Sequence, residues 1–136
     1  MAGYSVTPLA RKLGIKSGHG IALLNAPSGF PDLLEPLPDA TTTTTSLDGG
    51  GPFDVVVGFT TRRDTLVRWV AEVRPVLAPA GGFWVAWPKK ASKVPTEVTE
   101  ETVREVALPT GLVDNKVCAI DDTWSGLRLV IRRELR

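Results

Sequence analysis

Cysteine and histidine are scarce in this chain of 136 residues, which contains one of each, Cys118 and His19. A single cysteine excludes an internal disulfide framework and a zinc site built from several cysteines. The apolar runs are short, and none has the length of a signal peptide or of a membrane-spanning helix. We therefore expect a soluble protein in the reducing cytoplasm, without a membrane partner.

Positive and negative charges nearly balance, because 16 Lys and Arg residues and 15 Asp and Glu residues give a net charge of +1. This balance argues against nucleic acid as a partner, so that any basic site must be local. The apolar fraction of 43% and the charged fraction of 23% are typical of a soluble globular protein. The length is that of one ordinary domain, and we predict a single α/β domain over residues 1–136.

The most informative stretch is an apolar run that ends in a basic loop. It begins with a glycine pair at residues 81 and 82, which is suited to a turn with positive φ. Residues 82–87 favour a buried central strand, and Pro88 ends it because proline cannot donate to a sheet ladder. Trp84 and Trp87 are three residues apart and should face opposite sides of that strand.

Strand and helix patterns alternate along the rest of the chain. Strands are predicted at residues 20–25, 54–59, 115–120 and 127–132, and the first two are predicted to be buried. Helices are predicted at residues 7–14, 30–37, 61–77 and 96–108. Thr61 followed by Asp64 predicts a capping box at the start of the third helix. The alternation predicts a mostly parallel α/β sheet, and the short connection between the last two strands predicts an antiparallel hairpin.

Two interpretations of residues 41–51 stay open. The five consecutive threonines at 41–45 are β-branched and favour an edge strand. The glycines at 49–51 favour a flexible loop.

The order of these elements resembles the later half of the class I methyltransferase fold. Longer phrases are similar to an uncharacterised family of small bacterial proteins, catalogued as a domain of unknown function. These phrases lie at residues 7–15, 22–27, 84–93, 111–119 and 124–130. The resemblance implies a truncated, three-layer, Rossmann-like (methyltransferase-like) sheet, mostly parallel, with a C-terminal antiparallel hairpin. It implies no activity.

Two departures from class I methyltransferases concern their cofactor, S-adenosylmethionine. The first strand of that fold normally feeds a glycine-rich loop, whereas residues 25–29 contain one glycine and a rigid proline. Its second strand usually ends in an acidic residue that holds the ribose. Only 28 residues separate Asn25 from Asp54, and neither Asp39 nor Asp48 can be given that role from the sequence. We therefore expect no cofactor and disfavour S-adenosylmethionine.

Candidate binding residues follow the ends of three strands that are predicted to be parallel. The carboxyl ends of parallel strands meet at one edge of a sheet, where open α/β folds bind their ligands. Lysine ammonium groups and a serine hydroxyl can bind phosphate or another anion there. The competing interpretation is a solvated surface loop, because basic clusters are common on surfaces. The predicted ligand-binding set is Asn25, Pro27, Thr60, Trp87, Lys89, Lys90, Ser92 and Lys93.

No nucleophile–base pair and no metal-ligand spacing stands out in the sequence, which argues against an enzyme and against a metal site. These observations predict a non-catalytic methyltransferase-like domain with a binding or regulatory role. Two alternatives stay open: a small enzyme that acts on a phosphate-bearing small molecule, and a protein-interaction module that self-associates as a homodimer. The sequence identifies neither the ligand, the partner, the pathway nor the oligomeric state.

Overall fold

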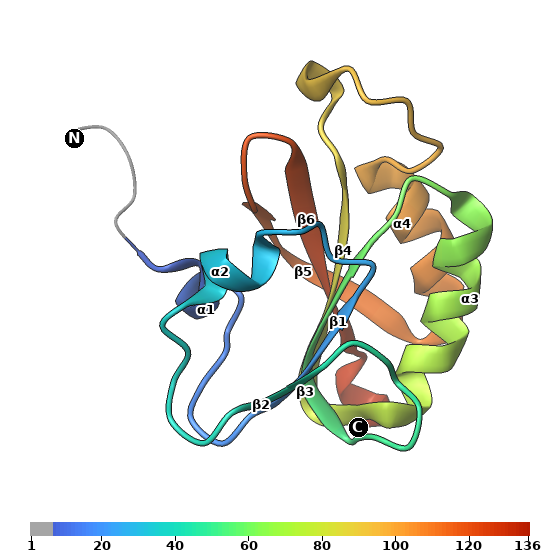
Figure 1. Ribbon diagram of the computed structural model, residues 1–136. Helices are drawn as coiled ribbons and strands as arrows, with labels where there is room; N and C mark the ends of the chain where they lie inside the picture. Colours follow the sequence, from blue (N-terminus) through green and yellow to red (C-terminus); the bar gives the residue numbers. More distant parts are fainter. Residues whose placement is uncertain (1–6) are drawn as a thin grey trace.

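Six strands form one sheet that runs through the middle of the molecule (Figure 1). The computed structural model describes residues 7–136. The strands are β1 (Gly20–Leu24), β2 (Thr42–Thr44), β3 (Phe53–Phe59), β4 (Leu77–Pro88), β5 (Leu112–Ala119) and β6 (Trp124–Ile131). Their order in the sheet is β2-β1-β3-β4-β6-β5, with the first four parallel and the last two antiparallel to their neighbours. This confirms the mostly parallel sheet with a C-terminal antiparallel hairpin.

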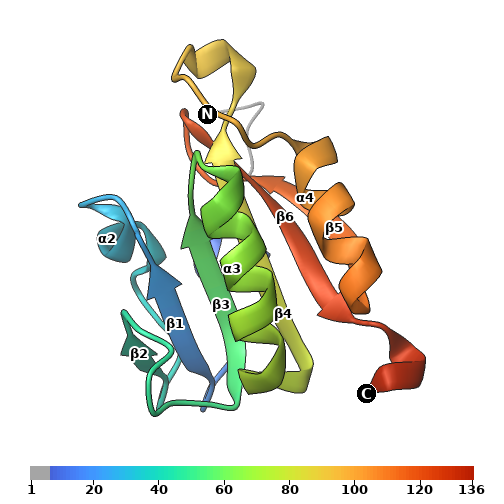
Figure 2. The same ribbon diagram turned by 90° about the vertical axis from the view of Figure 1, so that its right-hand side faces the viewer.

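Helices cover both faces of the sheet and make three layers (Figure 1). On one face lie α1 (Leu9–Lys12) and α2 (Phe30–Leu34), and on the other lie α3 (Arg63–Val73) and α4 (Glu100–Ala107), which stand in front of the sheet in Figure 2. Alternate residues of the buried strands pack into two separate hydrophobic clusters, one on each face. In the described range 7–136, no helix has both the length and the apolar character needed to cross a membrane.

The central strand β4 takes part in both clusters, as the spacing of its tryptophans predicts. Trp84 is fully buried on the α1 and α2 face, where its indole Nε1 donates to the carbonyl of Leu13 at 3.0 Å. Trp87 is buried on the α3 and α4 face. β4 therefore contributes a buried tryptophan to the hydrophobic core on each face of the sheet.

The prediction of a glycine turn before β4 is wrong. Gly81 and Gly82 lie inside β4, and neither has a positive φ. They are needed for close approach instead, since a Cβ on Gly81 would lie 2.9 Å from the carbonyl oxygen of Asp54. A Cβ on Gly82 would lie 2.3 Å from Nε of Arg128.

Residues 41–51 contain both an edge strand and a loop. The threonine run forms β2, whose three residues pair with β1, and residues 45–52 then cross to β3 as a loop. Between β2 and β3 the described chain has no helix. The loop passes on the α3 side of the sheet (Figure 1), where Leu47 packs against the core.

The two longer helices begin later than the sequence pattern predicts. α3 has Arg62 as its N-cap with no side-chain cap, so the predicted capping box of Thr61 and Asp64 does not form. Asp64 instead pairs with Arg62 at 3.1 Å, and this hydrogen bond lowers the pKa of the exposed Asp64 carboxyl. The capping box stands at α4, where Thr99 and Thr102 bond to each other's backbone N–H groups.

Candidate functional site

The neighbouring strands β1, β3 and β4 end at the same edge of the sheet. Their register places Leu24 beside Gly58 and Phe59 beside Ala86, in parallel pairing. Asn25 therefore follows β1 at the edge where Lys89 follows β4, which confirms the shared edge that the sequence predicts.

Two of the predicted binding residues at this edge are buried. Thr60 is 6% exposed, and its hydroxyl accepts a hydrogen bond from the backbone N–H of Arg62 at 3.0 Å. Trp87 is 8% exposed and packs in the core beneath α3 and α4. These two side chains therefore support the edge of the sheet from the protein interior and present little surface to a ligand.

The lysine loop, residues 89–93, folds back on itself beyond Pro88. Its backbone is tied to the β5–β6 turn, because the N–H of Lys89 donates to the carbonyl of Thr123 at 2.7 Å. The hydroxyl of Ser92 donates to the carbonyl of Lys89 at 2.7 Å. Lys90 and Lys93 are exposed. Anion binding by this loop stays a prediction.

A cavity of about 250 Å³ opens beside the carboxyl ends of β1 and β2. Three segments line this open cavity: the end of β1, the loop after β2 and the α3 helix. The lining residues of this Asp48 cavity are Leu24, Asn25, Thr45, Ser46, Leu47, Asp48, Trp69 and Glu72. It combines an apolar wall with hydroxyl, amide and carboxylate groups, which is the composition typical of small-molecule sites.

Local backbone structure sets the rim of the Asp48 cavity. Asn25 has a φ of 55°, a left-handed conformation that asparagine adopts more readily than most residues. In the loop after β2, the N–H of Asp48 donates to the hydroxyl of Ser46 at 3.0 Å. This hydrogen bond holds the loop in a local turn that ends at Asp48. Both Asn25 and Asp48 are exposed, so the lining of the cavity includes an amide and a carboxylate that solvent can reach.

Trp69 forms part of the apolar wall and is held rigidly. It is 5% exposed, and its ring lies against Gly58 of β3, where a Cβ would be 2.6 Å from the ring atom Cζ3. Glycine at position 58 therefore leaves the space that the indole occupies. A buried indole of this kind offers a stable apolar surface to a ligand.

The structure brings Asn25 together with Asp48, which the sequence reasoning had not placed. Asn25 lines the Asp48 cavity, whereas none of the lysines at 89–93 does. The acidic residue was missed because the threonine run could be a strand or a loop. Once residues 42–44 are a strand, Asp48 becomes the acidic residue that follows the second strand.

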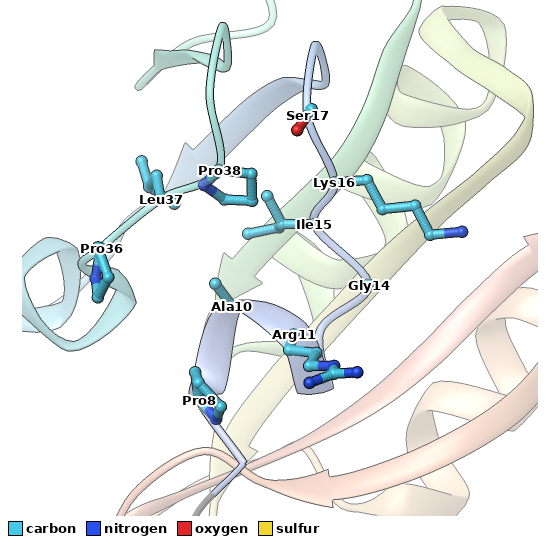
Figure 3. A pocket seen from close by; sticks show the side chains of 10 residues that line it. All are labelled: Pro8, Ala10, Arg11, Gly14, Ile15, Lys16, Ser17, Pro36, Leu37 and Pro38. Carbon is cyan, nitrogen blue, oxygen red and sulfur yellow. The ribbon is translucent and has the colours of Figure 1, made fainter.

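A larger cavity, of about 550 Å³, lies away from this edge on the α1 side (Figure 3). Its walls are the α1 region and residues 36–38, and Figure 3 shows Ile15 pointing toward Pro38 while Lys16 extends away from them. None of the predicted binding residues lines it. Among residues 7–136, no group of three or more His, Cys, Asp or Glu side chains is arranged to hold a metal ion.

Comparison with solved structures defines the class of fold. A SAM dependent methyltransferase from Aquifex aeolicus is 13% identical, with a TM-score of 0.67 over 90% of this chain and 88% of that chain. The N-methyltransferase NodS from Bradyrhizobium japonicum is 13% identical, with a TM-score of 0.61 over 91% and 90%. Fibrillarin from Aeropyrum pernix is 15% identical, with a TM-score of 0.59 over 90% and 73%. The chain has a methyltransferase-like Rossmann fold.

Sequence comparison gives the family. The chain belongs to the family described as Protein of unknown function (DUF3052), whose model matches residues 32–133. A comparison with curated proteins found no match. This match confirms the resemblance to a family of unknown function, over a range that includes the phrases at residues 84–93, 111–119 and 124–130.

The prediction of no cofactor, with S-adenosylmethionine disfavoured, is contradicted by these similarities. The Aquifex protein is SAM dependent, and the Aeropyrum fibrillarin contains natively bound S-adenosyl-L-methionine. The prediction relied partly on the lack of an acidic residue after the second strand. The position of Asp48 removes that reason.

Proposed function

We propose that this protein is a nucleoside-binding domain that holds S-adenosylmethionine at the Asp48 cavity. The observation that carries the proposal is the meeting of Asn25 and Asp48, which follow the first two strands, at one cavity. In the class I methyltransferase fold these are the positions of the cofactor loop and of the acidic residue that holds the ribose.

The chemistry of the cavity fits the nucleoside part of such a ligand. An ionised carboxylate only accepts hydrogen bonds, and the two ribose hydroxyls of a nucleoside can donate them. Within residues 7–136 the Asp48 carboxylate forms no salt bridge, so its oxygens are available to hydroxyl groups. Trp69 and Leu47 supply apolar surface for a base.

The size of the cavity limits what it encloses. Its volume of about 250 Å³ is below the range of about 300–1,000 Å³ for sites that bury a drug-sized ligand. The Asp48 cavity therefore encloses one part of the ligand, the ribose or the base. The amino-acid part would lie outside it.

The loop after β1 supports modest affinity. Pro27 has no N–H, so the loop offers fewer backbone donors than a glycine-rich one. Asn25 supplies a side-chain amide at the exposed rim in compensation. Bound S-adenosylmethionine carries an electrophilic methyl group, and the residues of the Asp48 cavity hold and orient its nucleoside.

We further propose a binding or regulatory role without methyl transfer. The support is the loop after β1, which has one glycine and a rigid proline where methyltransferases of this fold have a glycine-rich loop. Incubation of the protein with methyl-labelled S-adenosylmethionine and cell extract tests this role. Transfer of label to any protein, RNA or small molecule would show that the domain is an enzyme.

Calorimetric titration tests the binding itself. S-adenosylmethionine, S-adenosylhomocysteine and adenosine should bind, and Asp48→Asn should weaken all three about tenfold or more, as expected for a lost charge-assisted hydrogen bond. Asp39→Asn is the matched control, because Asp39 is exposed and precedes β2 at the opposite end of the strand. Absence of binding to the wild-type protein, or equal affinity in Asp48→Asn, would refute the proposal.

A further inference from the structure

A third cavity lies at the opposite end of the sheet from the Asp48 cavity, near the amino ends of the parallel strands. Its volume is about 250 Å³. The residues that line it are Gly14, Lys16, His19, Asp54, Ala80 and Arg128. His19 precedes β1, Asp54 and Ala80 lie near the starts of β3 and β4, and Arg128 reaches in from β6. We call it the Arg128 cavity.

Arg128 is held in this cavity by the backbone of β4. It pairs with Trp84 in the antiparallel register, and its side chain lies over Gly82, two residues away. A Cβ at position 82 would be 2.3 Å from Nε and 2.7 Å from Cζ of Arg128. The glycine therefore leaves the space that the guanidinium occupies.

The Arg128 guanidinium has no counter-charge bonded to it. It is half-buried and faces the cavity, and within residues 7–136 it forms no salt bridge and donates no side-chain hydrogen bond. The residue opposite it on β5 is Lys116, also a cation, whose ammonium donates to the carbonyl of Lys12 at 3.0 Å. A partly buried charge is costly unless it is paired, so the site favours an anion.

Burial and, secondly, the charge of Arg136 lower the pKa of Arg128. Both causes act against the charged form of the guanidinium. A bound anion would oppose both.

The other polar groups of the cavity suit an oxyanion. The Nδ1 of His19 accepts from the backbone N–H of Lys16 at 3.1 Å, so the neutral imidazole carries its proton on Nε2, as a donor. Lys16 is exposed and extends away from the apolar walls of the neighbouring cavity in Figure 3. The Oδ2 of Asp54 already accepts from the N–H of Gly20 at 2.8 Å. Two cations against one carboxylate leave an excess of one positive charge.

We propose that the Arg128 cavity binds a phosphate group, with Arg128 and Lys16 as its main ligands and His19 as a further donor. The volume of about 250 Å³ is roughly eight times the 30 Å³ that one water molecule occupies in the liquid. It can therefore take phosphate with bound waters, or the phosphate end of a small ester. This site is separate from the Asp48 cavity and from the lysine loop.

Titration with inorganic phosphate and with glycerol phosphate, at constant ionic strength with chloride as reference, tests the proposal. Both Arg128→Gln and Lys16→Gln should lower the phosphate affinity about tenfold or more, as expected for lost charge-assisted hydrogen bonds. Arg132→Gln is the matched control, because Arg132 is exposed and lies just beyond β6. Lys16 is exposed, so its variant keeps the test valid if Arg128→Gln unfolds.

The outcomes separate the sources of the phosphate and the competing sites. Tighter binding of glycerol phosphate would identify a phosphate ester as the ligand, and equal binding would identify free phosphate. No binding to the wild-type protein, or unchanged affinity in both variants, would overturn the site. Loss of affinity in Lys89→Ala combined with Lys90→Ala, instead of in these variants, would overturn it in favour of the lysine loop. S-adenosylmethionine binding should not change in Arg128→Gln, so the two sites can fail independently.

Discussion

Replacing Trp84 by phenylalanine should destabilise the protein through one hydrogen bond and one packing defect. Trp84 is 0% exposed, and its indole N–H donates to the buried carbonyl of Leu13. Orphaning a buried acceptor costs about 1–3 kcal/mol. The smaller ring loses burial worth about 1–2 kcal/mol, at about 0.8 kcal/mol for each CH₂-sized group. We expect the free energy of unfolding to fall by about 2–5 kcal/mol, a large share of the usual total of about 5–15 kcal/mol.

Trp87→Phe provides the matched control for this prediction. Trp87 is also buried, at 8% exposure, but its indole makes no hydrogen bond within residues 7–136. Its variant should lose only the packing contribution of about 1–2 kcal/mol. Urea titrations of the wild type and both variants, followed by far-ultraviolet circular dichroism, measure the difference. Equal destabilisation in the two variants would refute the role given to the Trp84–Leu13 hydrogen bond.

Two further predictions concern self-association and anion binding by the lysine loop. If the protein self-associates through β2, sedimentation at high concentration should show a dimer, and Thr43→Pro should remove it while Thr43→Ala should not. The N–H of Thr42 donates to the carbonyl of His19 inside the sheet, so the N–H of Thr43 points outward from the edge, where a second copy could accept it. Proline removes that N–H, whereas alanine keeps it. A monomer at all concentrations would count against this interface. If the lysine loop binds an anion, Lys89→Ala combined with Lys90→Ala should lower the affinity for phosphate about tenfold or more and flatten its salt dependence. Unchanged titration curves in the double variant would assign these lysines to the solvated surface.

The strands that the sequence predicts well are those whose pattern is local. β1 is an apolar run, β3 is apolar apart from Asp54 near its start, and Pro88 ends β4 because proline cannot donate to a sheet ladder. The parallel order of these strands follows from the helices that separate them, and the shared carboxyl edge follows from that order. These features need no knowledge of residues far away in the chain.

The features that the sequence does not predict depend on distant partners. A side chain at position 82 would collide with Arg128, which lies 46 residues later in the chain. A side chain at position 58 would collide with the ring of Trp69. The role of Asp48 depends on whether the threonine run pairs with the edge of β1, which no local pattern determines. The Asp48 cavity and the Arg128 cavity are made from segments that meet only in the folded sheet, and neither could be found by spacing along the chain.

The short strand β2 has a consequence for how the Asp48 cavity opens. Only three of its residues pair with β1, and the loop that follows has no helix to anchor it. Such a weakly attached edge can detach while the rest of the sheet stays intact, at a free energy below that of global unfolding. Amide protons of residues 42–48 should then exchange with solvent through this partial opening, and a nucleoside held by Asp48 would slow their exchange because it binds only the closed form.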